Sequence, residues 1–239
     1  MQDNCIFKML KYRKSEFIGL LATQLGMFIF LSIILRIIMA VDKDTTVFML
    51  GTNVSVMVIF FMAVLMGTTQ FMSSFNVSIS MGMIRRDYIF SYAIVTFIDI
   101  LFGLLITYIF YFIENVEINT IYSSFEREVG IEGILFSKYL IPIMIFMVSF
   151  VMLMGTLLLK YGNKMRIVLF VVWITFCMSF SRIADAMSGD SNGLLDGVFF
   201  KIGHYFTTSN SILIISEIII LSVLFMGISS RLLMKQQVT

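Results

Sequence analysis

Long, nearly uncharged apolar runs dominate this sequence, and they constrain its fold more than any other feature. Several runs reach the length of about 20 residues that an α-helix needs to cross the core of a bilayer. Backbone polar groups in lipid must be satisfied within each segment, so these runs predict helices, whereas a β-barrel would show short alternating strands. Only 13% of the residues are charged, against roughly 25% in soluble domains. We therefore expect an all-α polytopic membrane protein.

The apolar runs predict six spans within a single transmembrane domain that covers residues 1–239. The expected bounds are 17–39, 47–70, 88–113, 139–159, 167–183 and 212–232. Residues 1–16 are basic with scattered apolar positions, which predicts an amphipathic helix on the membrane surface, although a frayed tail would have the same composition. The basic side chains expected to face anionic headgroups are Lys8, Lys11, Arg13 and Lys14.

The distribution of positive charge predicts the orientation. Six spans place both termini on the same side, and most of the 17 Lys and Arg residues fall on that side. Positively charged loops stay in the cytosol, so we expect a multi-pass protein of the cell membrane with both termini cytosolic. A polar, glutamate-rich loop over 114–138 is then expected outside.

The stretch Gly67–Tyr88 is uncharged until Arg85 but too polar for an ordinary membrane helix. Gly82 interrupts its pattern, and Arg85, Arg86 and Asp87 follow. The stretch predicts a span that overruns the bilayer, turns, and lays a short amphipathic element at the cytosolic boundary, held there by the arginines. A plain connecting loop is the alternative. Asp87 is placed to cap the next helix.

A second amphipathic segment, 194–206, lies between the fifth and sixth expected spans. Its apolar residues share one side at helical spacing, and its polar residues fall on the other. This predicts an interfacial or re-entrant helix on the outer side. The apolar side includes Leu195, Phe199, Ile202 and Phe206.

Two acidic residues, Asp99 and Glu217, fall within expected spans. A carboxylate in lipid is costly, so each is a functional candidate by default. Either could line a polar path or pair with Gln24, Arg36 or Arg182. The alternative is a hydrogen-bonded pin between helices.

Gly19, Ala22 and Gly26 recur at steps of three and four in the first span, so they share one helix face. Small residues let another helix approach closely in a membrane. The face fits either an internal helix contact or a seam between two copies of the protein.

Motifs for chemistry are missing from the sequence. It has no G-x-x-x-x-G-K-[ST] and no G-x-G-x-x-G, so a P-loop for ATP is excluded. Its single histidine, His204, excludes H-E-x-x-H and histidine-rich metal sites. With no nucleophile and base at a useful spacing, we expect neither an enzyme nor a bound metal.

The segment 74–88, SFNVSISMGMIRRDY, resembles the type-2 permeases of ABC exporters, which have the type V fold. The likeness lies in small and apolar positions, a glycine, and a basic pair just before the third span. The six-span layout with a basic N-terminal helix adds to it. The resemblance implies a permease subunit of an exporter that moves peptides, antimicrobials or other amphipathic compounds.

The resemblance also implies partners and roles. A separate P-loop ATPase, in two copies, would bind ATP and Mg, and a second permease copy or paralogue would complete the unit, with no nucleic acid involved. The Gly19, Ala22 and Gly26 face would be the permease seam, and the 194–206 helix would close the exit. The residues implied to couple to the ATPase are Phe71, Phe75, Asn76, Met81, Gly82, Arg85, Arg86 and Lys164. A membrane sensor or assembly protein that performs no transport is the alternative function.

Overall fold

The computed structural model describes residues 2–41, 49–121, 135–162, 164–168, 170, 171, 174 and 210–235. The regular structure in these residues is helical, without a strand among them. The helices are α1 (Gln2–Tyr12), α2 (Lys14–Val41), α3 (Leu50–Ser80), α4 (Arg85–Ile121), α5 (Leu140–Tyr161) and α8 (Ser211–Met234).

Five of these helices, all except α1, are long and apolar enough to cross a membrane. This confirms the predicted class, an all-helical multi-pass membrane protein. The predicted fifth span, 167–183, lies largely outside the described residues, and the 194–206 segment lies outside them entirely. The count of six spans therefore stays a prediction.

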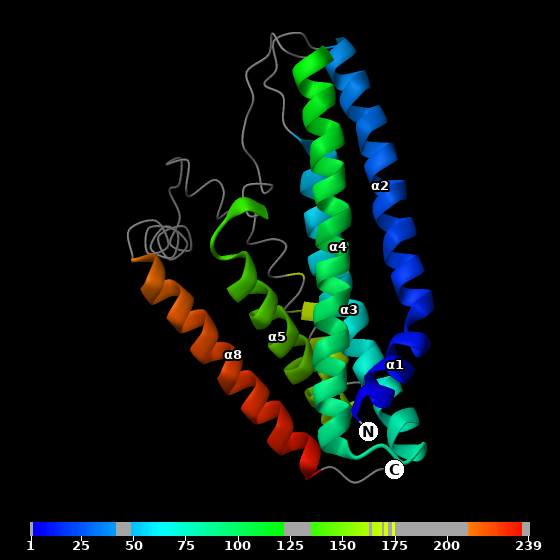
Figure 1. Ribbon diagram of the computed structural model, residues 1–239, viewed down its shortest axis with the longest axis vertical. Helices are drawn as coiled ribbons and strands as arrows, with labels where there is room; N and C mark the ends of the chain where they lie inside the picture. Colours follow the sequence, from blue (N-terminus) through cyan, green and yellow to red (C-terminus); the bar gives the residue numbers. More distant parts are fainter. Residues whose placement is uncertain are drawn as a thin grey trace.

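Helix α3 packs against α2, α4 and α5, and α4 contacts each of the other five helices. Helices α2, α3 and α4 stand side by side, while α5 and α8 are inclined beside them (Figure 1); α5 packs on both α3 and α8, and α8 packs mainly on α5. Helix α1, the turn between α3 and α4, and the last turn of α8 lie at the same end, which we call the terminal end (Figure 1).

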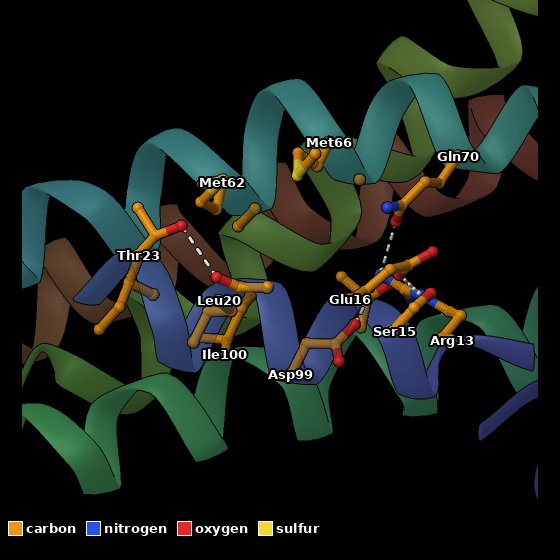
Figure 2. A pocket seen from close by; sticks show the side chains of 15 residues that line it. Arg13, Ser15, Glu16, Leu20, Thr23, Met62, Met66, Gln70, Asp99 and Ile100 are labelled. Atoms are coloured by element: carbon orange, nitrogen blue, oxygen red, sulfur yellow. Dashed lines mark hydrogen bonds and ion pairs between the residues drawn. The ribbon is translucent and has the colours of Figure 1, made fainter. Parts of the chain in front are cut away.

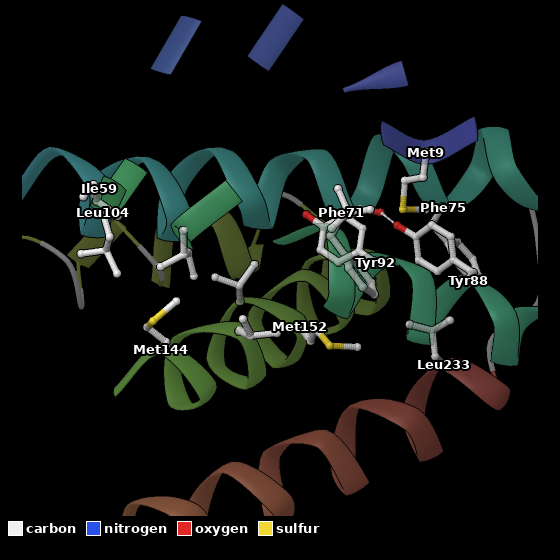
Figure 3. Close-up of a cluster of buried hydrophobic side chains, with 14 of the residues drawn as sticks. Met9, Ile59, Phe71, Phe75, Tyr88, Tyr92, Leu104, Met144, Met152 and Leu233 are labelled. Atoms are coloured by element: carbon white, nitrogen blue, oxygen red, sulfur yellow. Dashed lines mark hydrogen bonds between the residues drawn. The ribbon is translucent and has the colours of Figure 1, made fainter. Parts of the chain in front are cut away.

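A cluster of four aromatic side chains fills the core near the terminal end (Figure 3). Phe71 and Phe75 of α3 and Tyr88 and Tyr92 of α4 are at most 1% exposed. Their rings meet mostly edge to face, with Phe71 and Tyr92 centroids 4.8 Å apart. The Tyr88 hydroxyl lies 2.8 Å from the Phe71 carbonyl, to which it donates. Because the rings carry their own polar partners, the cluster joins α3 to α4 firmly.

Glycines allow α5 to approach α3 at this cluster. A Cβ built on Gly155 of α5 would lie 2.6 Å from the Phe71 Cβ atom. On α3, a Cβ built on Gly67 would lie 2.8 Å from Cγ1 of Val151. In a membrane, helices associate through such close packing, since lipid chains are as apolar as the side chains.

The amphipathic stretch after the second span is not a separate helix, which corrects the prediction. Helix α3 continues through Ser80, and only residues 81–84 separate it from α4. The polar residues remain in the helix because their hydroxyls donate to carbonyls three or four residues earlier, as Ser74 does to Gln70 at 2.6 Å and Ser80 to Val77 at 2.7 Å. A helical conformation therefore accommodates this composition without a break.

The prediction that a polar loop begins at Glu114 is also wrong about where the loop starts. Helix α4 runs on to Ile121, and Glu114 is 1% exposed. Its carboxylate accepts from the backbone amides of Gly51 and Thr52, at 3.0 and 2.8 Å, and from the Thr52 hydroxyl at 2.7 Å. These amides open α3 and lack partners within it, so Glu114 caps a helix other than its own.

Candidate functional site

The turn that joins α3 to α4 is exposed at the terminal end. Met81 and Ile84 are 78% and 68% exposed, and Arg86 is exposed beside them. Helix α3 ends there because Gly82 has a φ of +83°, a conformation that glycine adopts at little cost. The Gly82 and Met83 amides then donate to the Ile79 and Ser78 carbonyls at 2.9 and 3.0 Å. This paired bonding is the Schellman motif of a helix C-terminus.

The residues predicted to couple to an ATPase divide into two groups in the structure. Asn76, Met81, Gly82 and Arg86 are exposed at or near the turn, and Lys164 is exposed a few residues after α5. Phe71 and Phe75, in contrast, are buried in the aromatic cluster. These two phenylalanines support the turn from inside and do not present a surface to a partner. Helical periodicity alone could not distinguish the two orientations.

Arg85 is held by its own chain. Its guanidinium donates through Nη1 to the carbonyl oxygen of Met234, at the end of α8, at 2.9 Å. Asp87, predicted to cap α4, lies in the first turn of that helix, where a carboxylate favours the helix dipole. The turn is therefore tied to α8 as well as to the aromatic cluster.

A buried ion-pair cluster gathers around Arg13, where α1 meets α2 (Figure 2). Arg13 is 4% exposed and its Nη2 atom lies 2.6 Å from Oδ2 of Asp99 on α4. Its other donors reach the carboxylate of Glu16, Thr96 Oγ1 at 3.2 Å and Gln70 Oε1 at 3.1 Å. Its guanidinium carbon also lies 5.2 Å from the centre of the Tyr92 ring. Arg13 thus joins the start of α2 to both α3 and α4.

Arg13 keeps its positive charge in this cluster. Burial by itself lowers the pKa of the guanidinium, but the electrostatic influence of Tyr92, Asp99 and Glu16 raises it, and the net direction of the pKa shift is upward. The cluster corrects two predictions. Arg13 does not face lipid headgroups, and the described partner of Asp99 is Arg13, which was not among its predicted partners; of those, Arg182 lies outside the described residues.

Polar contacts continue along the same face of α4. Gln24, which is fully buried, donates from Nε2 to Ser55 Oγ at 3.2 Å and to Thr107 Oγ1 at 3.4 Å. Near the other end of α4, Arg36 pairs with Glu117 at 2.7 Å. Together with the Glu114 cap, these contacts connect α2, α3 and α4 at several positions along the length of the helices.

The remaining predicted residues have different outcomes. Glu217 lies on the exposed side of α8. Gly19, Ala22 and Gly26 are exposed on α2, and a Cβ built on Gly19 or Gly26 meets no described atom within 4 Å. The face therefore makes no close helix contact among the described residues, and its role as a seam between copies stays a prediction. The predicted exit-gate residues, namely Leu195, Phe199, Ile202 and Phe206, lie outside the described residues.

Sequence reasoning missed Arg13 and Glu114 as interior residues. One signal could have located their partners, because Thr96, Asp99, Gly103, Thr107 and Glu114 recur at steps of three, four and seven along α4. These steps keep polar groups on one helix face. Arg13 offers no such signal, since it belongs to a run of basic residues.

Comparison with known proteins adds no assignment. No protein-family model, curated protein or solved structure matches this chain. Within the part of the chain that the structure describes, no group of three or more His, Cys, Asp or Glu could hold a metal ion. The terminal end presents an exposed apolar and basic turn, and the ion-pair cluster around Arg13 is buried within the bundle.

Proposed function

We propose that this chain is the membrane-spanning permease subunit of an ATP-driven exporter that works with a separate P-loop ATPase. ATP and Mg bind on that partner, and two permeases, identical or paralogous, join two ATPases. The protein lies in the plasma membrane with both termini in the cytosol. Its cargo is a peptide, an antimicrobial or another amphipathic compound.

The exposed turn carries this proposal. Met81 and Ile84 present apolar surface at the end of the bundle, next to the exposed basic side chain of Arg86. Exposed apolar groups rimmed by polar residues are typical of a surface that binds a protein. An ATPase cleft that accepts such a turn would need an apolar floor and acidic edges.

The packing behind the turn supports a mechanical role. The turn is braced by the aromatic cluster between α3 and α4, and Arg85 ties it to α8. Packed interiors transmit displacement because they have few voids. A movement of the ATPase at Met81 and Ile84 would therefore pass to α3 and α4 as a unit, and through α3 to α2 and α5.

Co-purification tests the proposal. The tagged protein is extracted from its native membrane in mild detergent, and the amount of P-loop ATPase that accompanies it is measured. We expect Ile84→Asp to reduce that amount roughly thirtyfold, the effect of losing about 2 kcal/mol at a central contact. Arg86→Glu should weaken the association as well. Arg85 is a poor test site because its substitution also releases α8.

The matched control is Ile121→Asp, at the opposite end of α4. Ile121 is 61% exposed, so the substitution adds the same charge at an exposed isoleucine without touching the turn. Equal ATPase recovery with wild type, Ile84→Asp and Ile121→Asp would reject the turn as the docking surface. Recovery of no ATPase with any form would reject the permease function and favour a membrane sensor or assembly protein.

A further inference from the structure

A cavity of about 300 Å³ lies between α2, α3 and α4, next to the Arg13 cluster (Figure 2). Its lining is divided by chemistry. Arg13, Glu16, Gln70 and Asp99 gather on one side, whereas Leu20, Met62, Met66 and Ile100 line the rest. Most small-molecule sites are concave and largely apolar with a few well-placed polar groups, and this volume is at the lower end of their range.

The polar side of the cavity has spare acceptors. The guanidinium of Arg13 already donates to Glu16, Thr96 and Gln70 and pairs with Asp99. Arg13 therefore has little capacity to bind an anion. Glu16 and Asp99 face this single guanidinium, and each carboxyl group can accept several hydrogen bonds.

Both carboxylates retain access to the cavity. The side chains of Glu16 and Asp99 are 20% and 14% exposed. Glu16 also lies in the first turn of α2. An ammonium group is the natural complement, since it supplies three donors and one positive charge.

We propose that this cavity binds the primary amine of an amphipathic compound, with the ammonium group on Glu16 and Asp99. The hydrocarbon part lies against Leu20, Met62 and Met66, where flexible thioethers adapt to chains of different shape. The cavity volume of about 300 Å³ accommodates a headgroup and the first part of a hydrocarbon chain. The amine can come from a membrane lipid or from a free amphiphile. A role in cargo capture rests on the proposed exporter function, whereas the binding itself does not.

Binding of radiolabelled octylamine to the purified full chain tests this site. The protein is reconstituted in phosphatidylglycerol nanodiscs without any ATPase, and octanol of the same chain length is the neutral comparison probe. We expect saturable binding of octylamine, no saturable binding of octanol, and a loss of about tenfold in octylamine affinity for Glu16→Gln, as for a lost charge-assisted hydrogen bond. Glu117→Gln, which removes another arginine-paired carboxylate, should bind octylamine normally.

Two glycine variants test the location. Gly19 lines the cavity and Gly26 does not, and a Cβ on either meets no described atom within 4 Å. We expect Gly19→Leu to block octylamine binding and Gly26→Leu to leave it unchanged. Equal binding by Gly19→Leu and wild type would overturn the site, and equal binding of octanol would overturn the charge recognition.

A second set of nanodiscs distinguishes the two sources of the amine. Phosphatidylethanolamine that competes with octylamine would assign the site to a lipid headgroup, and the absence of competition would assign it to a free amphiphile. Because no ATPase is present, the binding result stands whether or not the exporter function is correct.

Discussion

Nη2 of Arg13 lies 2.6 Å from Oδ2 of Asp99, so a residue just before the first long helix is held by a carboxylate within α4. Both side chains are largely withdrawn from solvent, at 5% and 14% exposure. Arg13 also reaches Gln70 on α3. The contact thus closes the terminal end of the bundle, between the exposed turn and the amphipathic cavity.

Removing one partner of this pair should be costly. We expect Arg13→Gln to lower the free energy of unfolding by about 3 kcal/mol, because Asp99 is left buried and uncompensated. Arg13→Met combined with Asp99→Leu should recover much of the loss, since it removes both charges. The readout is the midpoint of thermal unfolding in detergent.

Arg36 and Glu117 provide the control for this prediction. They form a similar pair at 2.7 Å, but the Arg36 side chain is 61% exposed. Arg36→Gln should therefore cost less than about 1 kcal/mol. If Arg13→Gln proved no more destabilising than Arg36→Gln, the Arg13 cluster would not hold the terminal end together.

The seam between α3 and α5 should not tolerate a methyl group at Gly155. A Cβ there would lie 2.6 Å from the Phe71 Cβ atom, and overpacking of this kind costs about 1–3 kcal/mol. We expect Gly155→Ala to lower the unfolding midpoint in detergent. Gly227→Ala is the control, because a Cβ on Gly227 meets no described atom within 4 Å. An unchanged midpoint for Gly155→Ala would show that the helices separate there without strain.

The Glu114 carboxylate should stabilise the start of α3. Replacement by Ala leaves the Gly51 and Thr52 amides without their acceptor, which should cost about 1–2 kcal/mol. Glu114→Gln keeps one acceptor oxygen, so its cost should be smaller. Hydrogen exchange at the Gly51 and Thr52 amides checks the prediction directly. Equal protection in wild type and Glu114→Ala would mean that another group caps α3.

The exposed turn depends on the backbone of Gly82. Its φ of +83° is unfavourable for residues with a Cβ, so Gly82→Ala should cost about 1–2 kcal/mol or distort the turn. Asn tolerates this conformation better, and Gly82→Asn should retain more stability and more ATPase recovery than Gly82→Ala. Unfolding midpoints and co-purification of the ATPase measure the two effects separately. If Asn and Ala behave alike, the conformation of Gly82 does not control the turn.

The predicted site residues show where sequence reasoning reached its limit. The sequence marks Gly82 as an interruption of the pattern, but it predicts the turn before a separate amphipathic element, whereas α3 runs on to Ser80 and the chain turns at residues 81–84. The family resemblance implied that Phe71 and Phe75 belong to the partner surface, although both are buried in the aromatic cluster. The sequence around an aromatic residue in an amphipathic stretch does not show whether that residue packs inside its own protein or against a partner.

The sequence by itself determined the class of the protein, an all-helical chain with several helices apolar enough to cross a membrane, whereas α3 and α4 run several residues beyond their predicted ends. Helix formation in apolar runs is a local requirement, because each segment must satisfy its own backbone in lipid. The pairing of Arg13 with Asp99 and the capping of α3 by Glu114 were set by tertiary structure alone. Both contacts join residues that are far apart in the chain. They form only when each helix has the rotation and register that turn the right face toward its neighbour, and these depend on the packing of the whole bundle.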